Sequence, residues 1–159
     1  MICNLRQDFS QTDYPFVYLD PTISWHSGYR WWHGKFQRVI AALTKIWGVG
    51  YGDARLHFAK LMACVELVPY HSVSYGLSDK IRGKLRSARI ACEYVHEVLR
   101  PRAEGGELLS FVTRRRAEWG LAESSHVIAY SGSETRAAHL TPNSRGGKRI
   151  MEFARELGP

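Results

Sequence analysis

The residues with the most evident chemistry lie between Phe16 and Gly34, where a short apolar run ends in a carboxylate. Phe16 to Leu19 include no charged residue, which is typical of a strand buried on both faces of a parallel sheet. Pro21 cannot donate a hydrogen bond to a sheet, so we expect Asp20 at the carboxyl end of that strand, where open α/β sheets bind ligands. Asp20 is therefore a candidate catalytic carboxylate, and the alternative role is a cap of a turn or helix.

The loop that follows Pro21 is rich in aromatic rings, which are Trp25, His26, Tyr29, Trp31 and Trp32. Aromatic side chains can hold unpaired bases by stacking, at about 1–3 kcal/mol for each base. The other interpretation is that the rings cover one end of the core. We favour covering the core for Trp31 and Trp32, and stacking on a base for Tyr29.

A second candidate site is a phosphate-binding segment near the C-terminus, at Ser144, Arg145, Gly146, Gly147 and Lys148. Ser144 can cap a helix, and the two glycines allow a phosphate to approach the backbone closely. The free N–H groups at the start of a helix attract anions, and the neighbouring basic side chains add to this attraction. Glycine with basic residues before a helix is a common pattern, so its specificity is low.

Composition limits the class of protein and of partner. The chain has 159 residues and a formal net charge of +7, which favours one domain and a polyanionic partner, either nucleic acid or an anionic membrane surface. No apolar run approaches the roughly 20 residues of a spanning helix, and the N-terminus has no apolar signal core, so we expect a cytoplasmic protein that does not bind membranes. Three scattered cysteines predict reduced thiols, and we expect no metal and no cofactor.

The hydrophobic pattern alternates between strands and helices. The predicted strands are residues 16–19, 61–68, 108–113 and 126–130, and the predicted helices are residues 36–47, 53–60, 81–99 and 150–157. Residues 1–15 are expected to be an irregular arm, and Pro101 with the Gly105-Gly106 pair is expected to end the third helix. Right-handed crossovers then predict a single α/β domain over residues 1–159, a three-layer α/β/α fold with a central four-stranded parallel sheet. Asp20, Tyr70 and His71 would share one edge of that sheet.

Two motifs resemble those of the uracil-DNA glycosylase superfamily, whose fold is a four-stranded parallel sheet between helices. LDPTISWHSGY, from Leu19 to Tyr29, is similar to the family's first motif, which positions a water. HLTPNSRGG, from His139 to Gly147, is similar to its second motif, which enters the minor groove, and ELVPYHS resembles the strand end that lines the base pocket of small antiviral relatives. Thr22 and Ile23 stand where the family has a bulkier Tyr-His pair, which implies a pocket for a base larger than uracil.

The resemblance implies a role for each of these residues. Asp20 would orient a water and stabilise the positive charge that develops on the sugar, while His139 would donate a hydrogen bond to the departing base. His71 is the rival donor to the base. Tyr29 and Tyr70 would hold the extruded base between their rings.

The function that these roles imply is a monofunctional DNA glycosylase that removes a modified pyrimidine and leaves an abasic site. The expected substrate is double-stranded phage DNA with hydroxymethylcytosine or its glucosylated form, in antiviral defence, and no protein partner is predicted. One alternative is a catalytically inactive module of the same fold that binds DNA or nucleotides. The other alternative is a hydrolase of small nucleotides.

Overall fold

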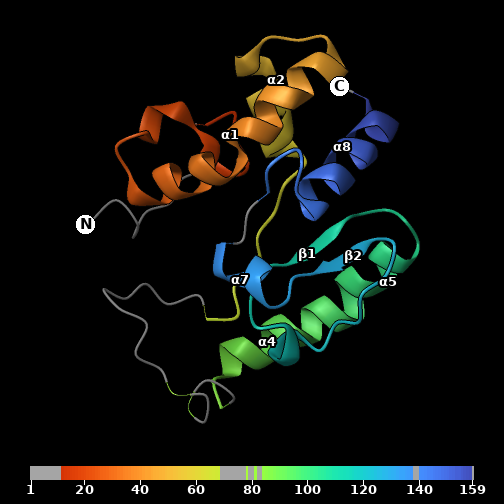
Figure 1. Ribbon diagram of the computed structural model, residues 1–159. Coiled ribbons are helices and arrows are strands. Elements are labelled where there is room, and N and C mark those ends of the chain that lie inside the picture. The colour runs from red at the N-terminus through yellow and green to blue at the C-terminus, as the bar shows by residue number, and fades with distance from the viewer. Residues whose placement is uncertain (1–11, 69–77, 79–80, 82–83, 138–139, 159) are drawn as a thin grey trace. The chain divides into compact units, whose positions relative to one another are not determined.

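The computed structural model describes residues 12–68, 78, 81, 84–137 and 140–158 (Figure 1). The chain divides into two compact units, Met1–Ala63 with His139–Pro159, and Cys64–Ala138. Helices make up 59% of the described residues and strands 5%. The predicted three-layer α/β/α fold with a central four-stranded parallel sheet is therefore wrong.

The first unit is built on one long helix, α1, which spans Ser27–Trp47. Its buried residues recur at three- and four-residue spacing and form a single stripe, at Tyr29, Phe36, Val39, Ile40, Leu43 and Trp47. The helix begins where the ring of His26 accepts a hydrogen bond from the Gly28 backbone N–H, 3.0 Å away. It ends at Gly48, whose φ of 66° is the left-handed conformation that stops a helix. The predicted helix over residues 36–47 is confirmed, and it begins within the predicted aromatic loop.

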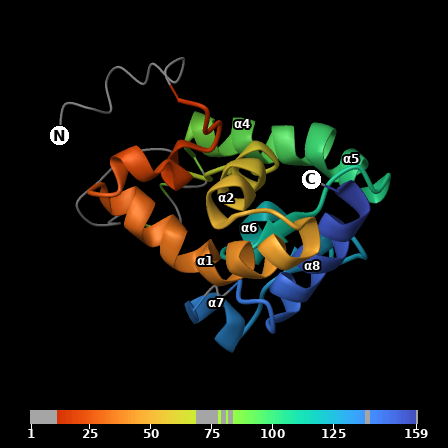
Figure 2. The same cartoon turned by 90° about the horizontal axis from the view of Figure 1, so that it is seen from above.

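Two further helices pack against α1, and the three lie together in both views (Figures 1 and 2). They are α2, Tyr51–Lys60, and α8, Arg145–Leu157, and both predicted helices in these segments are confirmed. The indole N–H of Trp47 donates a hydrogen bond of 3.2 Å to the Ala154 carbonyl, which joins the end of α1 to α8. Ala54, Phe58 and Ala59 of α2 are buried, and Phe58 packs its ring against Phe36.

The predicted strand over residues 16–19 is instead a turn of 3₁₀-helix, η2, at Val17–Leu19, followed by a second turn, η3, at Pro21–Ile23. Phe16 and Leu19 are buried, while Val17 and Tyr18 are only half-buried. A spacing of three places side chains on the same face of a 3₁₀-helix, so one short turn buries the two residues against α1 and α2. Asp20 therefore lies between two helical turns rather than at the end of a strand.

The second unit contains a helical run of three parts, which are α4 (Arg86–Tyr94), a turn of π-helix η4 (Val95–Leu99) and α5 (Arg100–Glu104). The predicted helix over residues 81–99 is confirmed from Arg86 onward. The prediction that the Gly105-Gly106 pair ends the helix is confirmed, since Gly105 caps α5, but the prediction that Pro101 ends it is wrong. Pro101 lies in the first turn of α5, where a missing N–H costs no hydrogen bond, so the chain continues as a helix to Glu104.

Two short strands of the second unit pair in parallel, β1 (Ser110–Val112) and β2 (Val127–Ala129), with α6 (Arg116–Trp119) between them and α7 (Ser133–Ala137) after them. They confirm the predicted strands over residues 108–113 and 126–130. Their apolar residues share a core with the helical run, made of Val95, Ala103, Val112, Leu121, Val127 and Ala129. The predicted strand over residues 61–68 is wrong, because that segment has no regular secondary structure and pairs with no described strand.

Candidate functional site

Asp20 is held by the turn that it starts. It is only 5% exposed, and its carboxylate accepts hydrogen bonds from the backbone N–H and the hydroxyl of Thr22, at 2.8 and 2.7 Å. The hydroxyl of Thr12 donates a third hydrogen bond, to the other carboxylate oxygen. The carboxylate thus caps η3 and holds Thr12 beside it. This is the capping role that the sequence offered as the alternative to catalysis.

Burial raises the pKa of Asp20, but the hydrogen bonds from Thr12 and Thr22 and the positive charge of Arg55 lower it by more, so the pKa lies below the ordinary value. The carboxylate is therefore ionised at neutral pH. An ionised carboxylate with three donors around it is well satisfied, and these hydrogen bonds engage both of its oxygens.

Tyr29 is buried in the first turns of α1, with 8% of its surface exposed. Its ring stacks on that of His33, with centroids 5.1 Å apart and planes within 9°. His33 in turn has its Nε2 atom 3.1 Å from the hydroxyl of Tyr51, at the start of α2. Tyr29 is therefore part of the packing between α1 and α2. Its burial does not favour the interpretation that its ring stacks on a base.

Arg55 lies beside these rings, one helical turn after Tyr51. Its guanidinium lies 5.6 Å from the ring centroid of Tyr14 and 5.9 Å from that of Tyr51, and its Nε atom donates a hydrogen bond of 3.3 Å to the Tyr14 hydroxyl. Burial and the charge of Arg55 both lower the pKa of His33. We call Tyr14, His33, Tyr51 and Arg55 the arginine cluster. It joins α1, α2 and the segment before η2.

The solvent-facing side of α1 is basic. The helix carries four basic residues and no acidic residue. Three of the basic residues, Arg30, Arg38 and Lys45, are exposed, and we call them the basic face of α1. Helical spacing places Trp31 among them, opposite the buried stripe. Trp31 is 46% exposed, with the ammonium of Lys35 5.3 Å from its ring centroid, so the interpretation that Trp31 covers the core is wrong.

The predicted phosphate-binding segment forms the start of α8. Ser144 caps the helix as predicted, because its hydroxyl accepts a hydrogen bond of 3.1 Å from the Gly147 N–H and donates one of 2.7 Å to the Thr141 carbonyl. Gly146 and Gly147 are buried, and a Cβ atom on Gly147 would lie 1.7 Å from the Thr141 carbonyl oxygen. Gly147 thus allows the turn at Thr141 to lie close to the backbone of α8. Lys148 is exposed, and phosphate binding here stays a prediction.

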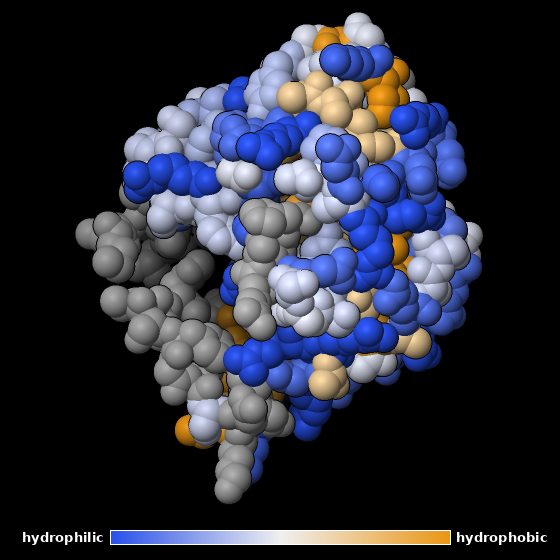
Figure 3. All heavy atoms as spheres, viewed as in Figure 1, coloured by the Kyte–Doolittle hydropathy of each residue, from blue (hydrophilic) through white to orange (hydrophobic). Residues whose placement is uncertain are grey.

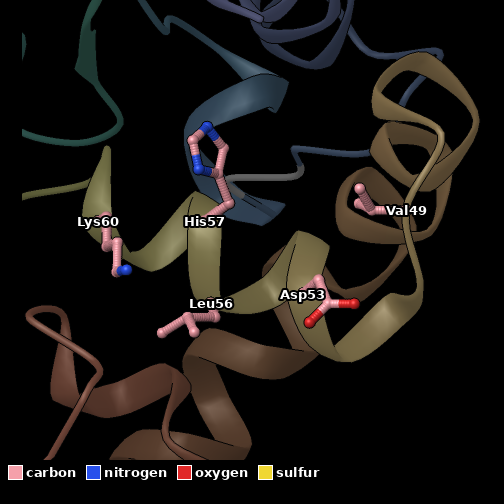
Figure 4. A pocket seen from close by; sticks show the side chains of 5 residues that line it. All are labelled: Val49, Asp53, Leu56, His57 and Lys60. Atoms are coloured by element: carbon pink, nitrogen blue, oxygen red, sulfur yellow. The ribbon is translucent and has the colours of Figure 1, made fainter. Parts of the chain in front are cut away.

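A shallow hollow of about 220 Å³ lies on another side of α2 and is lined by Val49, Asp53, Leu56, His57 and Lys60. The charged groups of Asp53 and Lys60 and the ring of His57 point to different sides (Figure 4). His57 packs edge-on against Trp47, with ring centroids 4.7 Å apart. These polar groups do not converge on one ligand.

The remaining predicted site residues, Tyr70, His71 and His139, lie outside the described residues. Within the described part of the chain, no helix is long and apolar enough to cross a membrane. The same part contains no group of three His, Cys, Asp or Glu side chains that could hold a metal ion.

No protein-family model matches the chain, and neither a curated protein nor a solved structure matches it significantly. The arrangement of side chains is therefore the basis for any functional conclusion. Sequence reasoning missed the arginine cluster. The available signal was the spacing of its residues, because His33 follows Tyr29, and Arg55 follows Tyr51, by one helical turn.

Proposed function

We propose that the protein binds nucleic acid through the basic face of α1. The observation that carries this proposal is a 21-residue helix with four cations and no carboxylate, three of whose cations are exposed on the side away from the core. An acid three or four residues away on the same helix can offset a cation. A helix without such acids keeps an uncompensated positive field, which attracts a phosphate backbone.

The dimensions of the basic face suit a nucleic acid. At about 1.5 Å per residue, Arg30 and Lys45 are roughly 22 Å apart along the helix axis. That length corresponds to about six base pairs of duplex, at roughly 3.4 Å per step of one strand. Contacts of this kind hold the backbone of a strand in place without reading its sequence.

An anionic membrane surface is the competing polyanion, and α1 is poorly suited to it. A helix that lies in a membrane interface needs an apolar face to insert. The apolar stripe of α1 is buried in the unit, and Trp31 is the one large apolar residue beside the basic face. The face of the molecule drawn in Figure 3 is mostly hydrophilic, with only small separate apolar groups.

The test compares two triple variants that lower the net charge equally. The first is Arg30→Gln/Arg38→Gln/Lys45→Gln. The control is Arg89→Gln/Arg100→Gln/Arg102→Gln, whose exposed arginines pair with Glu93, Glu104 and Glu107 at 3.5, 3.7 and 3.0 Å. Binding to a labelled duplex is measured over a series of salt concentrations.

We expect the first variant to bind more weakly, with the slope of log affinity against log salt reduced by about 0.9 for each lost phosphate contact. The control should keep a slope close to that of the unchanged protein, because its arginines are already offset by carboxylates. Equal losses in both variants would mean that only net charge matters. Binding to anionic vesicles without binding to the duplex would replace nucleic acid by a membrane as the partner.

Excision of a modified pyrimidine is a finer proposal, which the resemblance of Leu19–Tyr29 and His139–Gly147 supports. The hydrogen bonds of Asp20 do not favour it, because they engage both carboxylate oxygens. Mass spectrometry of bases released from DNA is the test. We expect release of hydroxymethylcytosine or its glucosylated form and little release of uracil. Absence of any released base would restrict the function to binding.

A further inference from the structure

Arg55 is fixed in place without a carboxylate partner among the described residues. Its guanidinium is stacked between the rings of Tyr14 and Tyr51, and the hydrogen bond that it donates comes from Nε. Asp20 interacts with Arg55 only through its charge. A guanidinium held in one orientation, with its outer N–H groups not used by a carboxylate, is suited to an oxyanion.

Two further polar groups lie next to Arg55. His33 and Tyr51 are joined by the 3.1 Å hydrogen bond between Nε2 and the phenol, and Tyr51 lies beneath the guanidinium. Tyr51 is 36% exposed, and Tyr14, His33 and Arg55 are half-buried. The cluster is thus partly exposed to solvent.

The charges of the cluster favour an anion. The groups that face His33 are Tyr29 from its own helix and Tyr51 and Arg55 from α2. Because burial and the charge of Arg55 both lower the pKa of His33, its ring is neutral at pH 7. The cluster then holds one positive charge. Of the single N–H of the neutral imidazole and the single O–H of the phenol, one makes the bond between His33 and Tyr51, and the other is left to donate to an anion.

We propose that Arg55, His33 and Tyr51 form a binding site for a phosphate group. The guanidinium would supply the charge and paired N–H donors, and the remaining N–H or O–H of the His33–Tyr51 pair would donate one further hydrogen bond. A purely structural role, tying Tyr14 to α2, explains the Nε hydrogen bond but requires no response to phosphate. The site does not depend on the basic face of α1, so the two proposals can fail separately.

A bound phosphate places negative charge near His33 and so stabilises its protonated form. We expect phosphate to raise the pKa of His33 by about 1, the size of effect that a neighbouring opposite charge produces. Nuclear magnetic resonance of the imidazole signals measures this in the intact protein, with sodium chloride at matched ionic strength as the reference. His57 is the internal control, because it lies on α2 close to Arg55 in the sequence but packs against Trp47 instead.

Two variants separate the phosphate site from a structural cluster. Arg55→Gln should raise the pKa of His33 in the absence of phosphate, since a repelling charge is gone, and should abolish the response to phosphate. Tyr51→Phe should weaken the response while leaving Arg55 and its stacking intact. Arg89→Gln, which removes an exposed arginine paired with Glu93 in α4, should leave the response unchanged.

Three probes distinguish the sources of the phosphate. A response to inorganic phosphate or to a 5′-mononucleotide would show a site for a small phosphate compound. A response to an oligonucleotide alone would show a site for a strand phosphate. If no probe shifts His33 beyond the shift of His57, or if Arg55→Gln or Tyr51→Phe responds as fully as the unchanged protein, the proposal is wrong.

Discussion

At the scale of single residues, Asp20 shows how much depends on the partners of a carboxylate. A buried aspartate before a proline in an aromatic segment has the appearance of a catalytic group. Here its oxygens accept hydrogen bonds from Thr12 and Thr22, and each of these bonds holds a local turn. Hydrogen bonds to a charged group contribute about 1.5–3 kcal/mol, so a stabilising role accounts for the residue without catalysis.

We expect Asp20→Ala to lower the free energy of unfolding by about 1–3 kcal/mol at neutral pH, since a cap and its charged hydrogen bonds are lost. The pKa of Asp20 is lowered in the folded protein. Its contribution is therefore fully present above the unfolded pKa of about 3.9 and declines as the pH falls through the folded value. Denaturant unfolding at several pH values measures this.

Asp13→Ala is the matched control for that experiment, because Asp13 is an exposed carboxylate in the same segment. It should change stability by less than about 0.5 kcal/mol at any pH. A loss for Asp20→Ala that stays constant from neutral pH to pH values well below 4 would contradict the role of the ionised carboxylate.

At the scale of elements, the phase of α1 decides which aromatic rings are buried. Tyr29 is in phase with Phe36, Ile40 and Trp47 and so belongs to the buried stripe. Trp31, two residues later, faces the opposite side with Arg38. A loop has no helical spacing, so expecting a loop here could not place Trp31 on the exposed side of a helix or Tyr29 in its buried stripe.

The start of α8 gives a prediction at the same scale. Gly147→Ala should destabilise the protein by about 2 kcal/mol or more, because the new Cβ would overlap the Thr141 carbonyl oxygen and the backbone would have to move. Gly34→Ala, within α1, is the control, since no atom lies within 4 Å of its Cβ position. It should stabilise by roughly 0.5–1 kcal/mol.

Denaturant unfolding measures both glycine variants. Similar small effects of the two substitutions would mean that the turn before α8 can move aside at little cost. In that case close packing against Thr141 would not explain the glycine. The phosphate-binding role that the sequence predicts for Gly147 would then be the better explanation.

At the scale of the whole molecule, the positive charge is unevenly divided. The first unit has eleven basic and six acidic residues, a net charge of +5, whereas the second has eleven and nine, a net charge of +2. In the second unit several arginines pair with nearby glutamates, among them Arg89, Arg100 and Arg115. The two units therefore differ in net charge because the first has fewer acidic residues. Its larger excess of positive charge is the reason that we assign nucleic-acid binding to the first unit.

The sequence by itself determined the helices with the strongest periodicity, in α1, α2, α4 and α8, and the two strands that pair. It also determined the cap at Ser144 and the excess of positive charge. These features depend on residues a few positions apart, so local spacing is sufficient to predict them.

Only the tertiary structure decided the rest, because it depends on pairing between distant residues. Residues 16–19 and 61–68 are apolar enough for strands, but a strand needs a partner, and the described strands pair only with each other. Without a central sheet, no shared edge gathers Asp20 with the other predicted site residues. The packing of α2 against α1 gathers His33, Tyr51 and Arg55 instead, and no local pattern in the sequence specifies that contact.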